Sequence, residues 1–259
     1  MSRVRVASFL CSLHLQRIFF LFLATNKILY PNNIRRIWIE SNTLIFHLII
    51  SNSHGIRREL GNGTLSLTTR LVRLVQERNL NIPVLAAGGI VDGSGLLAAL
   101  SLGADGAVLG TRLWVSEEAL GPIAYKNAIV KAASCDDVVR TQVFDTICNS
   151  YRDTKWPYPF DSSGTLRNTT TEDWDTSIHA LETELDSIFS VTSSSSKGNK
   201  NVIDKLNHAE EVQLPDAGCV YSGQGVGEIL SIAPAYDIIK QVEINATESY
   251  SRLQTVMSD

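Results

Sequence analysis

Two short glycine turns are the residues best suited to chemistry in this sequence. Gly88-Gly89 ends the apolar run 83–87, and Gly110-Thr111 ends a second apolar run at 107–109. Glycine has no Cβ, so backbone N–H groups in such turns can approach a phosphate closely, and a helix starting beyond the turn adds its positive end. One such turn would favour a plain strand–helix connection. The pair, one strand–helix unit apart, predicts the phosphate site that follows the last two strands of a (β/α) barrel.

A histidine lies where such a barrel carries its chemistry. His54-Gly55 follows the β-branched apolar run 43–50, which predicts a strand buried on both faces. An imidazole just past a strand end can act as a base, because its unperturbed pKa is near working pH. A lone histidine is more often a polar loop residue. His54 is a catalytic candidate because the two glycine turns mark the strand ends of the same predicted barrel, and His54 follows an earlier strand of it.

The segments between these turns predict an α/β fold. Apolar residues at helical spacing over 65–75 predict a helix, and a brief helix over 96–102 should be closed by Gly103. Short apolar strands alternating with helices indicate a parallel sheet with right-handed crossovers.

The second half of the chain predicts helices and loops. We expect a helix with Ser116 as its N-cap and Glu117 and Glu118 in its first turn. An extended segment over 138–145 and a short helix around 174–188 should follow. The low-complexity run 191–202 predicts a flexible surface loop, and the last segment holds a glycine cluster at 223–227 and a terminal helix after Pro234.

Composition narrows the classes of function. The net charge of -4 argues against a nucleic-acid partner, and the apolar run 18–24 is too short to span a membrane. The four cysteines have no CxxC pairing and no histidine at metal spacing, which predicts separate reduced thiols in a cytoplasmic protein and no metal site.

The N-terminal segment 1–42 differs from the rest of the chain. Its first 39 residues contain no Asp or Glu and six Lys or Arg residues. Three interpretations stay open: a gene-model artefact, a targeting sequence, or folded structure.

Four separate stretches together resemble one family. Residues 82–112, residues 116–119, the run 139–145 and the run 221–227 occur in the order found in fungal-type nitronate monooxygenases, also called 2-nitropropane dioxygenases. The resemblance covers roughly residues 53–245. It implies an FMN-binding (β/α)8 TIM barrel, of which this chain carries the last strands and a C-terminal segment that completes the cofactor site.

The resemblance also implies roles for particular residues. Gly88, Gly89, Gly110 and Thr111 would hold the FMN phosphate, and Gly223 and Gln224 would close over the cofactor. His54 would act near the flavin, as a base toward a nitroalkane or by orienting the nitronate. The family has an Ala-Gly-Gly-His-Gly turn here, whereas this chain reads Ser-Asn-Ser-His-Gly over residues 51–55.

Length predicts an incomplete barrel. Eight strand–helix units need ~250 residues, but only three strands fit between residues 43 and 115, which predicts N-terminal truncation or completion by a partner chain. We therefore divide the chain into an atypical segment 1–42, the C-terminal part of the barrel at 43–115, and a helical and loop segment at 116–259.

The resemblance implies oxidation of alkyl nitronates by O2 to a carbonyl compound and nitrite, with FMN as cofactor. Two alternatives stay open: an enoyl reductase of the same barrel type that uses FMN and NADH, and an inactive truncated pseudoenzyme. Nothing in the sequence predicts the oligomeric state.

Overall fold

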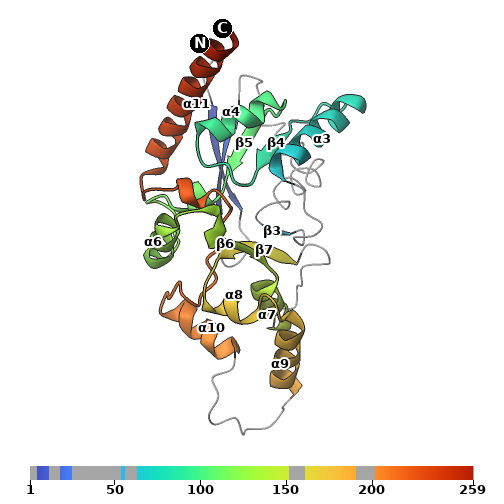
Figure 1. Ribbon diagram of the computed structural model, residues 1–259, viewed down its shortest axis with the longest axis vertical. Coiled ribbons are helices and arrows are strands. Elements are labelled where there is room, and N and C mark those ends of the chain that lie inside the picture. The colour runs from blue at the N-terminus through green and yellow to red at the C-terminus, as the bar shows by residue number, and fades with distance from the viewer. Residues whose placement is uncertain are drawn as a thin grey trace.

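The computed structural model describes residues 63–151, 161–190 and 202–258, together with the backbone of three strands at 5–11, 18–24 and 54–55. Figure 1 shows a sheet with its helices in the upper half and a second sheet across the middle, with further helices below it. In chain order the elements are β1 (Arg5–Cys11), β2 (Ile18–Ala24), β3 (His54–Gly55), α3 (Thr64–Glu77), β4 (Leu85–Ala87), α4 (Gly93–Ser101), β5 (Gly106–Leu109), α5 (Thr111–Trp114), α6 (Ile123–Lys131), η1 (Cys135–Asp137), β6 (Val138–Thr141), α7 (Val143–Tyr151), β7 (Ser162–Leu166), α8 (Thr169–Trp174), α9 (Ile178–Ser190), α10 (Val202–Glu211), η2 (Val226–Glu228) and α11 (Ala235–Ser258).

The first sheet has the strand order β1-β2-β5-β4. β4 and β5 are parallel, as the sequence predicted, and every residue of both strands is buried. β2 pairs with β5 antiparallel, and β1 pairs with β2 antiparallel, so the N-terminal segment contributes strands that the sequence did not predict. The expected strand at 43–50 lies outside the described residues. Among the strands that are described, the sheet is open and no closed barrel forms.

Both predicted helices of the β4–β5 unit are confirmed. α3 and α4 follow the expected apolar spacing, and Gly103 ends α4 with a left-handed backbone angle of φ +91°. The carboxylate of Asp105 accepts from the N–H of Val84 at 2.9 Å, and the N–H of Asp105 donates to Val84 O at 2.7 Å. This reciprocal pair aligns the start of the two strands, so the turns at their other ends lie side by side.

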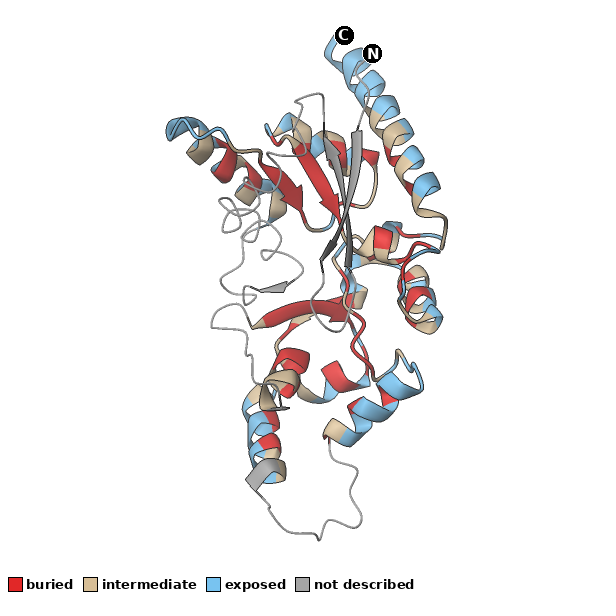
Figure 2. Ribbon diagram, turned by 180° about the vertical axis from the view of Figure 1, so that it is seen from behind, coloured by how far each residue is buried: buried red, intermediate tan, exposed pale blue. Residues whose placement is uncertain are grey.

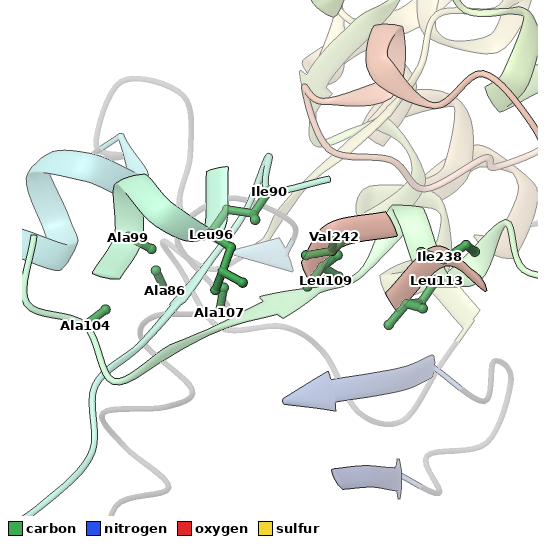
Figure 3. Close-up of a cluster of buried hydrophobic side chains, with 10 residues drawn as sticks. All are labelled: Ala86, Ile90, Leu96, Ala99, Ala104, Ala107, Leu109, Leu113, Ile238 and Val242. Carbon is green, nitrogen blue, oxygen red and sulfur yellow. The ribbon is translucent and has the colours of Figure 1, made fainter. Parts of the chain in front are cut away.

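α4 packs between the first sheet and the terminal helix α11. Figure 3 shows the buried cluster, with Leu96 and Ala99 of α4, Ala107 and Leu109 of β5, and Val242 of α11 among its members. The terminal helix after Pro234 is thus confirmed, although the half-exposed Ile244 faces away from the core.

The second sheet has the order β3-β7-β6 and is antiparallel throughout. β7 is buried at all five residues, and Figure 2 shows both β6 and β7 as mostly buried strands above the lower helices. One side of the sheet contacts a cluster around Tyr125, Ile129 and Val226. The helices α7, α9 and α10 share another cluster, around Phe144 and Leu181.

The segment after residue 115 corrects several expectations. The helix expected at Ser116 begins only at Ile123, because Ser116 is buried in an isolated bridge with Ala233. The extended segment 138–145 ends at Thr141, whose hydroxyl accepts from the N–H of Val143 and so starts α7.

Other expectations for this half of the chain have mixed outcomes. The helix around 174–188 is confirmed as α9. The proposed loop 191–202 lies outside the described residues except for Val202. Cys135 is exposed rather than part of the core, whereas Cys219 is buried. Within the described ranges, no helix has the length and apolar character needed to cross a membrane.

The contact between α4 and α11 gives a test of this packing. A Cβ on Gly93 would collide with the backbone of α11 at Val242 O and Ala246 N. We expect Gly93→Ala to lower the free energy of unfolding by about 1–3 kcal/mol, the usual cost of overpacking. Urea unfolding followed by circular dichroism measures the change.

The same substitution at Gly63 is the control. Gly63 has an ordinary φ of -63°, and a Cβ there would meet nothing within 4 Å. Gly63 is also the N-cap of α3, where glycine is preferred to alanine, so Gly63→Ala should cost about 0.5 kcal/mol, less than the collision at Gly93. Equal losses in the two variants would contradict the packing of α11 on α4.

Candidate functional site

The turn after β4 has a backbone that only glycine adopts easily. Gly88 has φ +108° and Gly89 has φ +72°, and L-residues rarely occupy either region. A Cβ built on Gly89 would meet none of the described residues within 4 Å, so they leave the side of the turn on which a side chain would lie uncovered. The turn can therefore present its backbone to a ligand.

Thr64, the first residue of α3, braces this turn. Its hydroxyl lies 3.0 Å from Gly88 O and 3.3 Å from Ala87 O, to which it can donate. The hydrogen bond from α3 thus fixes the orientation of the Gly88 carbonyl. No local pattern in the sequence predicts this contact of Thr64 with the turn.

The turn after β5 leads directly into the one-turn helix α5. Gly110 is the N-cap of α5 and provides no side-chain cap, so the first N–H groups of the helix have no intrahelical acceptor. In the part of the chain that the structure describes, a Cβ on Gly110 would also have no neighbour within 4 Å. Because α5 is only four residues long, these N–H groups, rather than a helix dipole, would bind an anion.

The longer helix α4 does not contribute its positive end as expected. The carboxylate of Asp92 accepts from the N–H of Gly95 at 2.8 Å and caps the helix. A second anion at this N-terminus would meet the negative charge of Asp92. The anion site is thus restricted to the two glycine turns.

The C-terminal glycine cluster reaches these turns. The N–H of Gly223 donates to the hydroxyl of Thr111 at 3.0 Å. A Cβ on Gly225 would approach Gly89 O to 2.8 Å, so Gly225 packs directly on the first turn. Gln224, between the two glycines, is exposed. The structure therefore brings five of the predicted cofactor residues together: Gly88, Gly89, Gly110, Thr111 and Gly223.

Backbone and side-chain contacts hold residues 231–235, which follow the glycine cluster, against α5 and the residues after it. Glu117 N–H donates to Ala233 O at 3.1 Å, and the half-buried Arg112 donates to Ser231 O at 3.2 Å. The carboxylate of Glu118 accepts from the N–H of Ala235, the first residue of α11, and this bond lowers the pKa of Glu118. Glu118 therefore caps α11 instead of the helix the sequence predicted.

A buried lysine fixes the segment that carries Glu118. Lys126 donates to Ser116 O at 2.6 Å and to Ala119 O at 2.7 Å, with only 3% of the residue exposed. Burial lowers the pKa of Lys126, while the negative charges of Glu118 and Glu117 act in the opposite direction. Its charge thus stabilises the turn that connects α5 to α6.

The strand β7 brings His54 toward the same place. His54 pairs with Ser163, and Tyr221 forms a bridge with Thr165 two residues further along β7. Since β6 occupies the other edge of β7, the segments containing His54 and Tyr221 follow one another along a single edge. Ser222 is the last residue of the Tyr221 segment that bonds to β7, and the glycine cluster begins at the next residue, Gly223. The backbone of His54, paired with Ser163, therefore lies next to the start of the glycine cluster. The side chain of His54 is outside the described residues.

Ser222 is a second residue that sequence reasoning missed. It is 3% exposed, and its hydroxyl has no hydrogen-bond partner among the described residues. A buried unpartnered hydroxyl costs about 1–3 kcal/mol and calls for an explanation such as a ligand. Its place beside Gly223 was visible in the sequence, but a serine in a glycine-rich run carries no signal of burial.

The described residues hold no group of three or more His, Cys, Asp or Glu side chains that could bind a metal ion.

Comparison with known proteins identifies the family. The family model for nitronate monooxygenase matches residues 53–244. The chain belongs to the nitronate monooxygenase family. Nitronate monooxygenase npaC of Metarhizium robertsii is 31% identical over 201 residues, which cover 74% of this chain and 48% of npaC. A probable nitronate monooxygenase of Staphylococcus saprophyticus is 44% identical over 77 residues, 30% of this chain and 20% of that protein. The chain thus spans at most about half the length of these two relatives.

Solved structures share the fold. FabK from Thermotoga maritima matches with a TM-score of 0.58 and 24% identity, covering 80% of this chain and 55% of its own. Nitroalkane oxidase from Streptomyces ansochromogenes matches with a TM-score of 0.54 and 20% identity, covering 79% of this chain and 51% of its own. Both identities are below 25%, so these two matches show that the fold is shared.

The brace on the first turn can be tested by stability. Thr64→Val keeps the shape of the side chain but removes the donor to Gly88 O, so we expect unfolding to become easier by about 1 kcal/mol. Thr64→Ser, which keeps the hydroxyl, should lose much less. Thermal and urea unfolding measure both.

Thr69→Val is the matched control in the same helix. Its hydroxyl bonds only to Leu65 O, one turn back in α3, and this bond is exposed. Its removal should change stability by no more than about 0.5 kcal/mol. If Thr69→Val and Thr64→Val were equally destabilised, Thr64 would have no special function in holding the turn.

Proposed function

We propose that this chain binds FMN through its two glycine turns and acts in the oxidation of alkyl nitronates by O2 to a carbonyl compound and nitrite. The observation that carries the proposal is the convergence of Gly89, Gly110, Thr111 and Gly223 on one place. A Cβ at Gly89 or Gly110 would meet none of the described residues within 4 Å, which supports a backbone cradle for a phosphate. The family supports the choice of a nitronate as substrate.

In this proposal the phosphate of FMN is held by N–H groups of both turns and by the hydroxyl of Thr111. That hydroxyl already accepts from the N–H of Gly223, so its own proton is directed elsewhere and can be donated to a phosphate oxygen. FMN, when bound, supplies the electron acceptor for the nitronate. Gly223 and Gln224 close the C-terminal segment over the cofactor.

His54 is proposed to handle the proton of the substrate. A neutral imidazole can remove the proton next to the nitro group of a nitroalkane, or it can orient a nitronate that is already formed. The pairing of β3 with β7 supports this role, because it places the backbone of His54 beside the segment that leads to Gly223. This chain has Asn52 and Ser53 where the family has two glycines before the histidine, so an experiment must test whether His54 acts on the substrate.

A visible absorbance titration with FMN and with riboflavin tests the cradle. Gly110→Ala should weaken FMN binding by about 10- to 100-fold, since its Cβ would project toward the phosphate and displace charge-assisted hydrogen bonds. Riboflavin lacks the phosphate, so its affinity should be unchanged. Folding should also be unaffected, because Gly110 has a negative φ of -91° and free space around its Cα.

Two results would contradict this part of the proposal. Unaltered FMN affinity in Gly110→Ala would mean that the second turn does not hold the phosphate. Absence of a bound-flavin spectrum in the parent chain would favour the alternative of an inactive pseudoenzyme.

The function of His54 is tested by turnover. With the FMN-loaded protein, His54→Ala should lower the rate of nitrite release from nitroethane by about 10²- to 10⁴-fold, the usual contribution of a general base. Supplying preformed ethylnitronate should restore much of the rate if His54 removes the proton, and little of it if His54 orients the nitronate. FMN affinity should not change. Full activity in His54→Ala would exclude both functions.

An assay on the same FMN-loaded protein distinguishes a nitronate monooxygenase from an enoyl reductase. NADH consumption with a crotonyl thioester, without nitrite release from ethylnitronate, would favour an enoyl reductase over a nitronate monooxygenase.

A further inference from the structure

Three side chains at the start of α8 hold the segment that leads into the glycine cluster. They donate hydrogen bonds to the consecutive carbonyl groups of residues 215–218. The amide of Asn168 donates to the carbonyls at the two ends of this turn, Pro215 O at 3.1 Å and Gly218 O at 2.7 Å. The hydroxyls of Thr169 and Thr170 donate to the two carbonyls between them, at 2.7 Å and 2.8 Å. We call the side chains of residues 168–170 the carbonyl clamp.

The amide of Asn168 is fixed in one orientation. Its oxygen accepts from the N–H of Thr171 at 3.1 Å, and its own backbone N–H donates to the Thr171 hydroxyl, so Asn168 caps α8. The nitrogen of the amide therefore faces residues 215–218, whose carbonyl oxygens can only accept. The cap uses the oxygen alone, so the two bonds from the nitrogen are not needed to start the helix and serve only to hold the turn.

The segment held by the clamp joins β7 two residues later. Val220 O accepts from the N–H of Leu166 at 3.0 Å, and the N–H of Ser222 donates to Gly164 O at the same distance. Two residues of extended chain span only about 7 Å, so fixing Gly218 O also fixes which residue lies opposite Leu166. A slip by one residue would break the clamp bonds and turn each side chain of this segment to the other face of the sheet. The clamp therefore sets the register of residues 220–222 on β7.

We propose that Asn168, Thr169 and Thr170 are positioning residues for the cofactor site, because the register they set places the Gly223 N–H on the Thr111 hydroxyl. This inference rests on the proposed function for the identity of the cofactor, whereas the contact between Gly223 and Thr111 belongs to the protein itself. The clamp side chains bond to residues 215–218 and within α8, so their effect reaches Thr111 through residues 219–223. This stretch is short and bonded to β7 along the way, which leaves little slack to absorb a displacement of the turn.

Amide hydrogen exchange of the full chain, followed by mass spectrometry of its peptides, tests the positioning directly. Asn168→Asp keeps the side-chain oxygen that caps α8, but it replaces the two donors with an oxygen that repels the carbonyls of Pro215 and Gly218. We expect exchange over residues 219–225, which include the Gly223 N–H, to become faster by about tenfold. Exchange over α8 should stay as in the parent chain.

The affinity for FMN relative to riboflavin measures the consequence for the cofactor site. Asn168→Asp should weaken FMN binding by about tenfold and riboflavin binding hardly at all, since Gly223 meets Thr111 beside the turns proposed to hold the phosphate. A merely structural role would lower the fraction of folded protein and weaken the two ligands equally. The ratio of the two affinities therefore separates positioning from general destabilisation.

Thr169→Val removes one bond of the clamp at an exposed position and brings in no buried charge. It should change exchange and the affinity ratio in the same direction by a smaller factor, and Thr169→Ser, which keeps the hydroxyl, should behave as the parent chain. Thr183→Val is the matched control, because its hydroxyl donates to His179 O one turn back in the exposed face of α9. It should leave both measurements unchanged. Should Asn168→Asp fail to fold, the Thr169 variants decide the outcome.

The two proposals fail in different ways. Exchange over residues 219–225 that is as slow in Asn168→Asp and Thr169→Val as in the parent chain would overturn the positioning role, even if FMN binds and nitrite is released. Faster exchange with an unchanged ratio of FMN to riboflavin affinity would overturn the link between the clamp and the cofactor site. Conversely, faster exchange in the variants of a parent chain that binds FMN no more tightly than riboflavin would support the positioning of Gly223 and contradict the proposed phosphate site.

Discussion

The hydrogen bond from the Gly223 N–H to the Thr111 hydroxyl is the interaction on which the site depends. It joins two residues that are 112 positions apart, one at the start of α5 and one at the edge of the antiparallel sheet. Without it, the C-terminal segment would not be held beside the two glycine turns after β4 and β5. With it, the third segment lies against the first turn through Gly225, and three backbone segments border a single space. A single neutral hydrogen bond contributes only about 1 kcal/mol, so it can persist only if its two ends are already held in place.

The surrounding contacts provide that support. Ser231 O accepts from the side chain of Arg112 in α5. In the segment that follows α5, Glu117 N–H donates to Ala233 O, and the Glu118 carboxylate accepts from the N–H of Ala235. The ammonium group of Lys126 also holds the segment after α5, because it donates to the carbonyl oxygens of Ser116 and Ala119. Several of these groups are exposed and individually weak, but they act on one short stretch of chain. The loop therefore loses little further conformational entropy when its glycines meet the turns.

The sequence predicted the parts of the site that depend on local backbone chemistry. Gly88, Gly89 and Gly103 occur where the chain needs a left-handed backbone, and such a requirement is visible in the residue type itself. The helix start expected at Ser116 was wrong. Ser116 and the two glutamates after it look like a helix start, but Ser116 instead forms a bridge with Ala233, a residue so distant in the chain that the local sequence cannot predict the contact. The same reason explains why Thr64 and Ser222 were missed: their roles are set by a partner, or by the lack of one, far away in the chain. The strands of the second sheet were also missed in large part, since Ser162, Ser163 and Gly164 have little strand propensity and are buried by tertiary packing.

The two sheets meet at the glycine cluster. The parallel pair β4–β5 ends in turns without side chains, which suits a phosphate that is bound by N–H groups. In the antiparallel sheet the N–H of Ser222 donates to Gly164 O of β7, and the next residue, Gly223, donates to the hydroxyl of Thr111. One peptide step therefore joins the antiparallel sheet to the glycine turns. A shift of residues 220–222 along β7 would move Gly223 away from Thr111, so the register of this pairing constrains the proposed cofactor site even though none of its bonds involves a side chain of the turns.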